Sequence, residues 1–588
     1  MAAGHAARAE YGSDLIVDVL RGLGIEYAAL NPGATFRGLH DSLVNYGHNT
    51  RPELIQCCHE EIAVAVAHGY AKAAGRPMAA IVHNVVGLQH AGMAIFNAWC
   101  DQAPILVLGG TGPMAADRRR PWIDWIHTAL VQGQAVRDYV KWDDQPASVA
   151  AIPEALVRGH RIAVTEPRGP VYICFDADLQ EAALDARPVP PDFPRFAPPS
   201  RVQADAAALD RAAALLRAAE RPVIVAQYAG RAPAAVDALV RIAEALGAPV
   251  IDLFEHGRFN FPSTHRLDLT DSPREVLASA DVVLALDVVD LYGTFSRLDR
   301  LTRVSETVLP ETAKVIHITM ADAGIRSWVT HYQRLAPVDV PILADTAAAL
   351  PALLARLTET PPAATPARRA RAEEMRRRHD ALRRDARSRC EAERNARPIA
   401  PSRLAAEVWE ALHAEDWILA NGSLDGWARR LWDWTRPDQF LGGSGGAGLG
   451  YGAGAAIGAA LAHRGTGRIC VDLQADGDLL YTPSALWTAA HHHIPVLFVM
   501  CNNRSYFNDE DHQALIAAAR RRPVEHRVVG IRIEEPPVDF AAMARAFGVH
   551  GEGPVEDPAQ IAPAVRRALR VVKDEGRPAL VDVVLRPE

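Results

Sequence analysis

The stretch CVDLQADGDLLYTPSALWTAAHHHIPVLFVMCNNRSYFN, residues 470–508, decides the fold of the C-terminal part of the chain. An apolar run at 469–473 is typical of a buried strand, the pattern breaks at Asp476, and an apolar helical segment leads to a second run at 496–500. This order predicts one β-α-β unit of a parallel sheet. Asp476 and Asn503 follow the two strands, and ligands of open parallel sheets bind at the carboxyl ends of strands.

The side chains at these two strand ends predict a metal site. Asp476 and Asn503 offer hard oxygen ligands, which suit Mg²⁺ because it completes an octahedral shell with water and phosphate oxygens. Gly477 allows the backbone to approach a phosphate, and the following helix presents free amide groups and a positive dipole end to an anion. The alternative is a structural Asp/Asn pair that caps a strand-to-helix turn.

The same residues carry a family resemblance. The pattern DG at 476–477 and NN at 502–503 resembles the metal and diphosphate motif of enzymes that depend on thiamine diphosphate (ThDP). Ala475 replaces the first glycine of that motif, and Asp478 stands where many relatives have serine or alanine. The resemblance implies that the metal ligands are Asp476, Asn503 and, through its backbone carbonyl, Ser505. The cofactor-binding residues expected in this part of the chain are Ser423, Leu449, Gly477, Asp478 and Tyr481.

Composition restricts the class of protein and its partners. The 588 residues suffice for roughly three to four domains, and 49% hydrophobic with 23% charged residues is typical of a globular protein. The net charge of −8 argues against nucleic acid or an anionic membrane as a partner. Seven cysteines without a CxxC pair, together with the lack of an apolar signal core, predict a cytoplasmic protein.

The N-terminal part predicts a second parallel sheet with a polar rim. Its apolar runs predict strands at 27–30, 53–57 and 78–82. Asn31, Glu60 and His83 follow these runs, so we expect them to meet at one edge of the sheet. Glu60 also opens a helix, where the dipole favours a carboxylate, so an ordinary helix cap is the alternative role.

The helix that begins near Glu60 extends the resemblance. HEE at 59–61 and GYA at 69–71 are spaced as in the pyrimidine-binding domain of ThDP enzymes. In that family a glutamate nine residues before the glycine of GYA contacts the aminopyrimidine ring, and Glu60 holds that place. The benzoylformate decarboxylase branch, whose framework acetolactate synthases share, is favoured by NPG at 31–33, His83, NAW at 97–99, KW at 141–142 and SALWTAA at 484–490.

This branch also assigns roles around the first strand end. Asn31, Pro32 and Gly33 are expected at the cofactor, and His83 is a candidate proton shuttle. A structural histidine at a strand end is the alternative for His83. Ala34 replaces a serine expected to contact the substrate carboxylate, which argues against benzoylformate itself as the substrate.

Several motifs point away from other ligands. The glycine-rich run at 442–450 lacks the Lys-Ser/Thr ending of an ATP-binding loop, and the resemblance instead makes Leu449 an apolar wedge between the two cofactor rings. QYAGR at 227–231 is no dinucleotide fingerprint, which argues against FAD. The histidines at 491–493 are consecutive, so on a helix they do not share a face and cannot all bind one zinc ion.

The resemblance implies an α/β fold with three doubly wound parallel-sheet domains. These are a pyrimidine-binding domain at 1–186, a central domain at 201–356 and a diphosphate-binding domain at 401–588. A linker and charged helix at 357–400 connects the last two. Central strands are predicted at 222–227, 249–254, 282–286 and 314–318. The charged helix is expected to be solvated because its charges are mixed in sign.

Two further segments are candidates for the site. Residues 504–513 are expected to form a loop over it, with His512 as a second acid or base. The aromatic segment 121–127 either lines a pocket or packs onto its own domain, and the sequence leaves both open.

The function that the resemblance implies is that of a ThDP- and Mg²⁺-dependent lyase or carboligase. Glu60 would protonate the pyrimidine, a 2-keto acid would lose carbon dioxide through an enamine, and protonation or addition to an aldehyde or keto acceptor would follow. An acetolactate synthase-like transferase and a catalytically silent ThDP-binding homologue are the alternatives. The family also implies a homodimer or homotetramer with active sites at the subunit interface.

Overall fold

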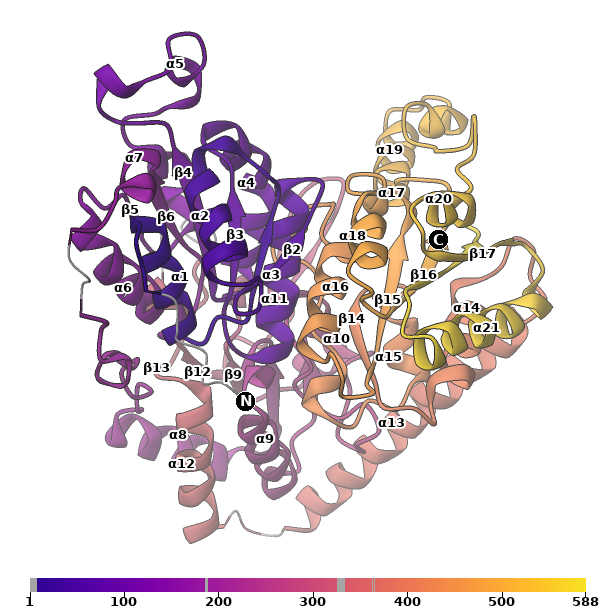
Figure 1. Cartoon of the computed structure of the whole chain (residues 1–588). Coiled ribbons are helices and arrows are strands. Elements are labelled where there is room, and N and C mark those ends of the chain that lie inside the picture. Colours follow the sequence, from indigo (N-terminus) through magenta and orange to yellow (C-terminus); the bar gives the residue numbers. More distant parts are fainter. Residues whose placement is uncertain (1–7, 186–188, 325–333, 362, 364, 588) are drawn as a thin grey trace. The chain divides into compact units, whose positions relative to one another are not determined.

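The structure is a computed structural model that describes residues 8–587 except 186–188, 325–333, 362 and 364 (Figure 1). The chain forms two compact units. The first contains Met1–Pro199, Ser444–Thr466 and Asp478–Val496, and the second contains Ser200–Gly443, Gly467–Gly477 and Leu497–Glu588. Three parallel sheets with flanking helices confirm the predicted α/β class.

The first unit is built on a six-stranded parallel sheet in the order β2-β1-β3-β4-β6-β5. Its strands are β1 (Tyr27–Leu30), β2 (Glu53–Gln56), β3 (Met78–Val82), β4 (Ile105–Thr111), β5 (Asp143–Asp144) and β6 (Val171–Asp176). The chain runs outward from β1 to β2 and then returns to β3 on the other side of β1. The carboxyl ends of β1 and β3 therefore flank a topological switch point, where such sheets bind ligands.

Helices cover both faces of this sheet. Helices α1 (Gly12–Gly22) and α6 (Ile152–Val164) pack together over one core, and α3 (Glu60–Ala74) and α4 (Val85–Cys100) pack together against β3. The shorter helices of this unit are α2 (Arg37–Asp41), α5 (Asp124–His127), α7 (Ala177–Glu181) and α18 (Ala485–His491). At the start of α1, the side chain of Asp14 accepts the backbone amides of Glu10 and Tyr11.

Helix α16 (Gly452–Ala462) packs on α3 with its backbone close to that of α3. A Cβ on Gly69 would overlap the carbonyl oxygen of Ala455, and one on Gly458 would overlap that of Val66. The GYA glycine and the Ala/Gly composition of α16 are therefore required by this packing, because larger side chains would force the helices apart.

The second unit contains the central sheet, in the order β13-β12-β9-β7-β8. Its strands are β7 (Pro222–Ala226), β8 (Val250–Asp252), β9 (Val282–Leu286), β12 (Lys314–Thr319) and β13 (Val340–Leu343), with an antiparallel hairpin of β10 (Ser296–Leu298) and β11 (Ser305–Thr307). Its helices are α8 (Ala206–Ala218), α9 (Pro233–Leu246), α10 (Pro273–Leu277), α11 (Leu291–Thr294) and α12 (Thr346–Glu359). The sequence did not predict β13, which contains Pro341 and lies at the sheet edge, where proline is tolerated.

The second unit also contains the C-terminal sheet, in the order β14-β15-β16-β18-β17 (Figure 1, orange to yellow). Its strands are β14 (Trp417–Asn421), β15 (Ile469–Ala475), β16 (Val496–Asn502), β17 (His550–Val555) and β18 (Ala579–Val584). Its helices are α14 (Pro401–Leu412), α15 (Trp427–Leu431), α19 (Phe507–Ala519), α20 (Phe540–Ala546) and α21 (Ile561–Asp574). The short helix α17 (Asp476–Leu479) begins in this unit and ends in the first. The predicted strand-helix-strand order at 469–502 is confirmed, with β15 and β16 as neighbours.

The charged segment forms the 27-residue helix α13 (Pro366–Ala392), but the expectation of a solvated helix is wrong for one face. Met375, His379 and Ala386 are buried on that face. The guanidinium of Arg371 donates to the carbonyl oxygens of Glu220 and Pro222 at 3.1 and 3.0 Å. The long charged side chains thus fasten α13 to the central sheet, which charge pattern alone does not reveal.

Among the described residues, no helix is long and apolar enough to cross a membrane.

Candidate active site

Asp476 follows β15 and has the properties of a carboxylate built to hold a cation. It is 2% exposed, its Oδ1 accepts the amide of Gly477 at 2.9 Å, and its Oδ2 has no hydrogen-bond partner among the described residues. Burial raises the pKa of Asp476 to about 6. A buried carboxylate oxygen without a partner is costly unless a ligand completes it, so this residue fits Mg²⁺.

Asn503 and Ser505 follow β16 in a tight turn. Oδ1 of Asn503 accepts the amide of Ser505 at 3.0 Å, and the hydroxyl of Ser505 donates to Glu510 at 2.9 Å. The guanidinium groups of Arg532 and Arg527 also bond Glu510, and with burial opposing them they lower its pKa to about 2. The Ser505 hydroxyl is therefore used inside this network, and the contribution of its carbonyl to a metal site stays a prediction.

Gly477 is required here for packing as well as for any ligand. A Cβ on Gly477 would overlap the ring of Tyr506, which lies against this turn. This packing role is additional to the close approach of a phosphate that the sequence predicts for Gly477.

Asp478 acts on the chain's own backbone in the first unit. Its Oδ1 accepts the amide of Gly450 at 2.7 Å, and its Oδ2 accepts the amide of Gly452 at 3.1 Å. The hydroxyl of Thr482 donates to the carbonyl of Gly450 at 3.0 Å. Two amide donors therefore offset the charge of Asp478, and the carboxylate holds the turn that carries Leu449. Tyr481, expected at the cofactor, is 58% exposed.

Leu449 projects from a turn that packs on α3 and α4. Gly448 exchanges two hydrogen bonds of 3.2 Å with the side chain of Asn97, and a Cβ on Gly448 would overlap Met93. On the other side, a Cβ on Gly450 would lie 2.7 Å from Oε1 of Glu61. Leu449 itself is 37% exposed, so its apolar side chain is only partly covered by the described residues.

Glu60 is the first residue of α3 and is 4% exposed. Its Oε2 lies 3.2 Å from Nδ1 of His90 on α4, and a Cβ on Gly87 would lie 2.7 Å from its Oε1. The ring of His59, which caps α3, stacks on His90 with centroids 4.9 Å apart. Sequence reasoning missed His90, because only the pairing of α3 with α4 brings it to Glu60.

His59, Glu60 and His90 also place three metal-type ligand atoms within 4.8 Å of one another, in the part of the chain that the structure describes. Nδ1 of His59 is already used as the acceptor for the amide of Glu61 at 3.1 Å. The cluster is thus committed in part to capping α3.

Glu61, the neighbour of Glu60, titrates differently from an ordinary glutamate. Burial and the charge of Asp478 raise the pKa of Glu61 to about 7. A carboxyl that exchanges its proton near neutrality therefore lies beside the Leu449 turn.

His83 follows β3 at the switch point of the first sheet. Its Nδ1 lies 2.9 Å from the hydroxyl of Thr35, and its Nε2 lies 3.0 Å from the amide nitrogen of Asn84. Burial and His127 lower the pKa of His83. Its ring fills the space in which Gly33 would carry a side chain, which explains the glycine of NPG.

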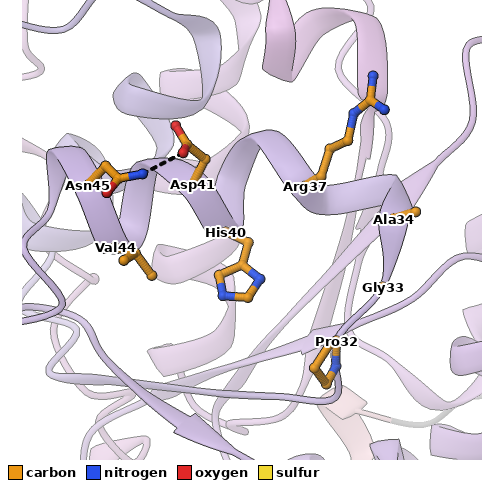
Figure 2. A pocket seen from close by; sticks show the side chains of 8 residues that line it. All are labelled: Pro32, Gly33, Ala34, Arg37, His40, Asp41, Val44 and Asn45. Carbon is orange, nitrogen blue, oxygen red and sulfur yellow. Dashed lines mark hydrogen bonds between the residues drawn. The ribbon is translucent and has the colours of Figure 1, made fainter.

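Asn31, Pro32 and Gly33 form the turn after β1. Pro32, Gly33 and Ala34 line a pocket of about 620 Å³ together with Arg37, His40, Asp41, Val44 and Asn45 (Figure 2). Figure 2 shows Asn45 bonded to Asp41 and His40 projecting between Val44 and Pro32. Neither Glu60 nor His83 is among the residues that line this pocket, although the His83 ring lies against Gly33, which does.

Three expected site segments have outcomes of their own. The predicted loop at 504–513 is wrong in part, since α19 begins at Phe507 and carries His512 on its exposed side. The hydroxyl of Ser423 donates to Glu255 at 3.1 Å and accepts the amide of Gly426. Trp122 and Trp125 are 75% and 71% exposed, so packing onto their own domain is wrong for both.

Three family models match this chain. They are the thiamine pyrophosphate enzyme N-terminal TPP binding domain at 11–133, its central domain at 209–353 and its C-terminal TPP binding domain at 420–583. Together they span most of the chain, in the order that the three sheets follow.

Known proteins of similar sequence and structure agree with these matches. A probable acetolactate synthase large subunit from Methanocaldococcus jannaschii is 25% identical over 98% of this chain and 92% of its own. A benzoylformate decarboxylase from Pseudomonas aeruginosa is 27% identical over 84% of this chain and 85% of its own. A ThDP-dependent 4-hydroxybenzoylformate decarboxylase from Rhodococcus jostii RHA1 shares the fold, with a TM-score of 0.76, 20% identity and coverage of 98% and 99%.

The three parallel sheets and the three matched domains define an α/β protein with thiamine diphosphate binding domains. The chain belongs to the ThDP-dependent enzymes, in the branch of benzoylformate decarboxylases and acetolactate synthases.

Proposed function

We propose that this enzyme is a ThDP- and Mg²⁺-dependent lyase or carboligase that acts on a 2-keto acid. The observation that carries the proposal is the buried carboxylate of Glu60 at the start of α3, with the Leu449 turn packed on the same helix pair. Glu60 and Leu449 are the acid and the apolar wedge that the family resemblance expects at the coenzyme.

The coenzyme, when bound, supplies a carbon nucleophile that attacks the keto group and an electron sink for the bond to carbon dioxide. Asp476, Asn503 and Ser505 would hold Mg²⁺ and, through it, the diphosphate, as the unpartnered Oδ2 of Asp476 supports. Glu60 would hold a proton at the pyrimidine nitrogen in a site shielded from water. Asp478 would keep Leu449 in place through the backbone of Gly450 and Gly452.

The choice between simple decarboxylation and carbon–carbon bond formation concerns the second half of the reaction. Relatives of both kinds match this chain over most of its length. Ala34 brings no hydroxyl to the switch point, and the hydroxyl of the neighbouring Thr35 already pairs with His83. We therefore propose a 2-keto acid other than benzoylformate, to be identified with a panel of 2-keto acids, each with and without an acceptor aldehyde.

The experiment that tests the function is hydrogen–deuterium exchange at C2 of bound ThDP. The wild-type enzyme should accelerate exchange, Glu60→Gln should nearly abolish it with Mg²⁺-ThDP still bound, and Glu53→Gln on β2 should leave it unchanged. Full exchange in Glu60→Gln would refute the role of Glu60. No acceleration by the wild type would favour the catalytically silent homologue.

We further propose a cytoplasmic homo-oligomer. The seven cysteines are all free thiols, which supports a reducing compartment. Oligomeric active sites, expected from the family, are tested by mixing variants as described in the Discussion.

A further inference from the structure

We propose that His127, rather than His83, is the proton carrier that serves the substrate at the switch point of the first sheet. This inference rests on the proposed function, because it assigns a proton that the 2-keto acid reaction needs. Its first observation is that both ring nitrogens of His83 already take part in hydrogen bonds.

Asn84 fixes the protonation state of His83. Asn84 is fully buried, and its Oδ1 accepts the amide of Val86 at 3.0 Å as the cap of α4. Its Nδ2, which can only donate, therefore faces Nε2 of His83 at 3.0 Å. Nε2 must then accept, so the ring proton lies on Nδ1 and is donated to the hydroxyl of Thr35 at 2.9 Å.

A neutral His83 in this arrangement is a structural group. To take up a proton, Nε2 would have to break its bond to the buried Asn84 amide, which would be left unpaired. Burial and the neighbouring His127 also lower the pKa of His83, which favours the same neutral form. The ring is thus suited to orient its neighbours, and poorly suited to carry protons to a substrate.

His127 lies directly against this ring. The two imidazole centroids are 5.6 Å apart at an angle of 88°, so the edge of one ring meets the face of the other. His127 ends α5 and is partly exposed, unlike Thr35 and Asn84, the buried hydrogen-bond partners of His83. A proton carrier needs this combination of contact with the site and access to water.

Helix α5 is anchored well enough to place His127. Asp124, three residues earlier, is fully buried and accepts the amide of Arg120 at 2.8 Å and its guanidinium at 2.7 Å. Gly112 leaves no room for a side chain between the turn and β4, since its Cβ would lie 2.8 Å from the hydroxyl of Thr128. These contacts hold the turn on its buried side, while Trp122 and Trp125 face solvent.

The charged groups that act on these two rings come from α3, from α5 and from the turn before α5. Glu60 raises the pKa of His83 and Arg120 lowers it, while Arg120 and His127 lower the pKa of Asp124.

The step that His127 would perform balances as follows. When carbon dioxide leaves a 2-keto acid, the bond to the carboxylate breaks and the carbon that remains must gain one proton to become an aldehyde. His127 in its charged form gives that proton and becomes neutral. It regains a proton from water at the exposed side of α5. In carbon–carbon bond formation the same proton goes to the acceptor oxygen.

The test compares His127→Gln with His83→Gln in the holoenzyme, with Ile126→Ala as the control for disturbance of α5. We expect His127→Gln to lower kcat for aldehyde formation about 100-fold. The decline of the rate at high pH should disappear, and C2 exchange of ThDP should be unchanged. Added imidazole should restore part of the rate in His127→Ala. His83→Gln should keep the high-pH limb.

A second measurement is independent of turnover. In coenzyme-free protein with labelled histidine, the His83 signal should remain that of a neutral ring at pH values where an ordinary histidine is charged.

Two results would overturn the inference. One is a wild-type kcat and high-pH limb in His127→Gln. The other is equal loss of C2 exchange and of turnover in that variant, which would make the residue structural. Absence of C2 exchange in the wild type would instead defeat the proposed function itself.

Discussion

Oδ1 of Asp478 accepts the backbone amide of Gly450 at 2.7 Å and so helps to hold the turn that presents Leu449. Asp478→Ala removes this bond and the one to Gly452, so two amides lose their acceptor. We expect the unfolding free energy to fall by about 1–3 kcal/mol and ThDP affinity to fall with it, since the wedge is no longer held. Asp478→Asn keeps one acceptor oxygen and should lose less of both. Wild-type ThDP affinity in Asp478→Ala, measured by calorimetry, would contradict the role.

The raised pKa of Glu61, about 7, predicts a pH-dependent stability. Because the folded-state pKa lies above the ordinary value of 4.5, this group stabilises the fold fully below about pH 4.5, and the contribution is lost as pH rises through 7. Glu61→Gln should therefore become more stable relative to wild type as pH increases from 5 to 8. Chemical unfolding at several pH values measures this. Parallel curves for the two proteins would show that Glu61 does not titrate in that range.

In the variant Asp478→Asn, the loss of stability that accompanies ionisation of Glu61 should occur at lower pH. The charge of Asp478 is one cause of the raised pKa of Glu61, so its removal leaves burial as the main cause. An unchanged curve would indicate that burial alone sets the pKa.

Asp476 should show opposite effects on function and stability. Asp476→Ala removes a buried carboxylate whose Oδ2 lacks a partner, so the metal-free variant should be at least as stable as the metal-free wild type. Mg²⁺-dependent ThDP binding should fall more than about tenfold, and chelation of Mg²⁺ from the wild type should have the same effect. Thermal unfolding with and without Mg²⁺ and ThDP gives both quantities. A variant that is less stable without metal and still binds Mg²⁺-ThDP would contradict the assignment.

Mixing two inactive variants tests whether an active site takes residues from two chains. If Glu60 of one subunit serves the Mg²⁺ site of another, a dimer of Glu60→Gln and Asp476→Ala chains has one intact site. Random re-association makes half of the dimers mixed, so the mixture should recover about one quarter of wild-type activity. Sites formed within single chains would recover none. The unmixed variants are the controls.

Arg429 should contribute to stability through a buried ion cluster of the second unit. Its guanidinium donates to Asp268 at 2.7 Å and to Asp252 at 3.3 Å, and all three groups are buried. Arg429→Met leaves two buried carboxylates without their cation and should destabilise the fold by about 3–5 kcal/mol. The neighbour Arg430 pairs with Asp271 at a partly exposed position, so Arg430→Met should cost about 0–1 kcal/mol. Equal losses in urea unfolding would remove the special role of the buried cluster.

Much of the fold could be predicted because its elements have local signals. The apolar runs that become β1, β3 and β9 match the observed strands at both ends. The switch-point rim followed from strand order, which brings Gly33 and His83 together. By contrast, α19 was predicted as a loop although its first turn carries Asp509 and Glu510 and its end is rich in alanine, because the expected role of the segment outweighed its helix signals.

The missed site features depend on contacts between distant segments. His90 reaches Glu60 only through the packing of α3 with α4, and Asp478 turns to Gly450 because the chain returns there after β15. Neither relation leaves a trace in spacing along the sequence. The segment around His127 was left open for the same reason, since its contact with His83 joins a short helix to a strand end.

The backbone contact between Gly69 on α3 and Ala455 on α16 has a consequence for redesign of this enzyme. With no side chain between the two helices, the spacing from Glu60 to Leu449 cannot be tuned by enlarging or trimming residues along that seam. Directed evolution toward new substrates should therefore find few tolerated changes there. Accepted changes should accumulate in the solvent-facing aromatic segment around Trp122 and Trp125, where volume can vary without separating the helices.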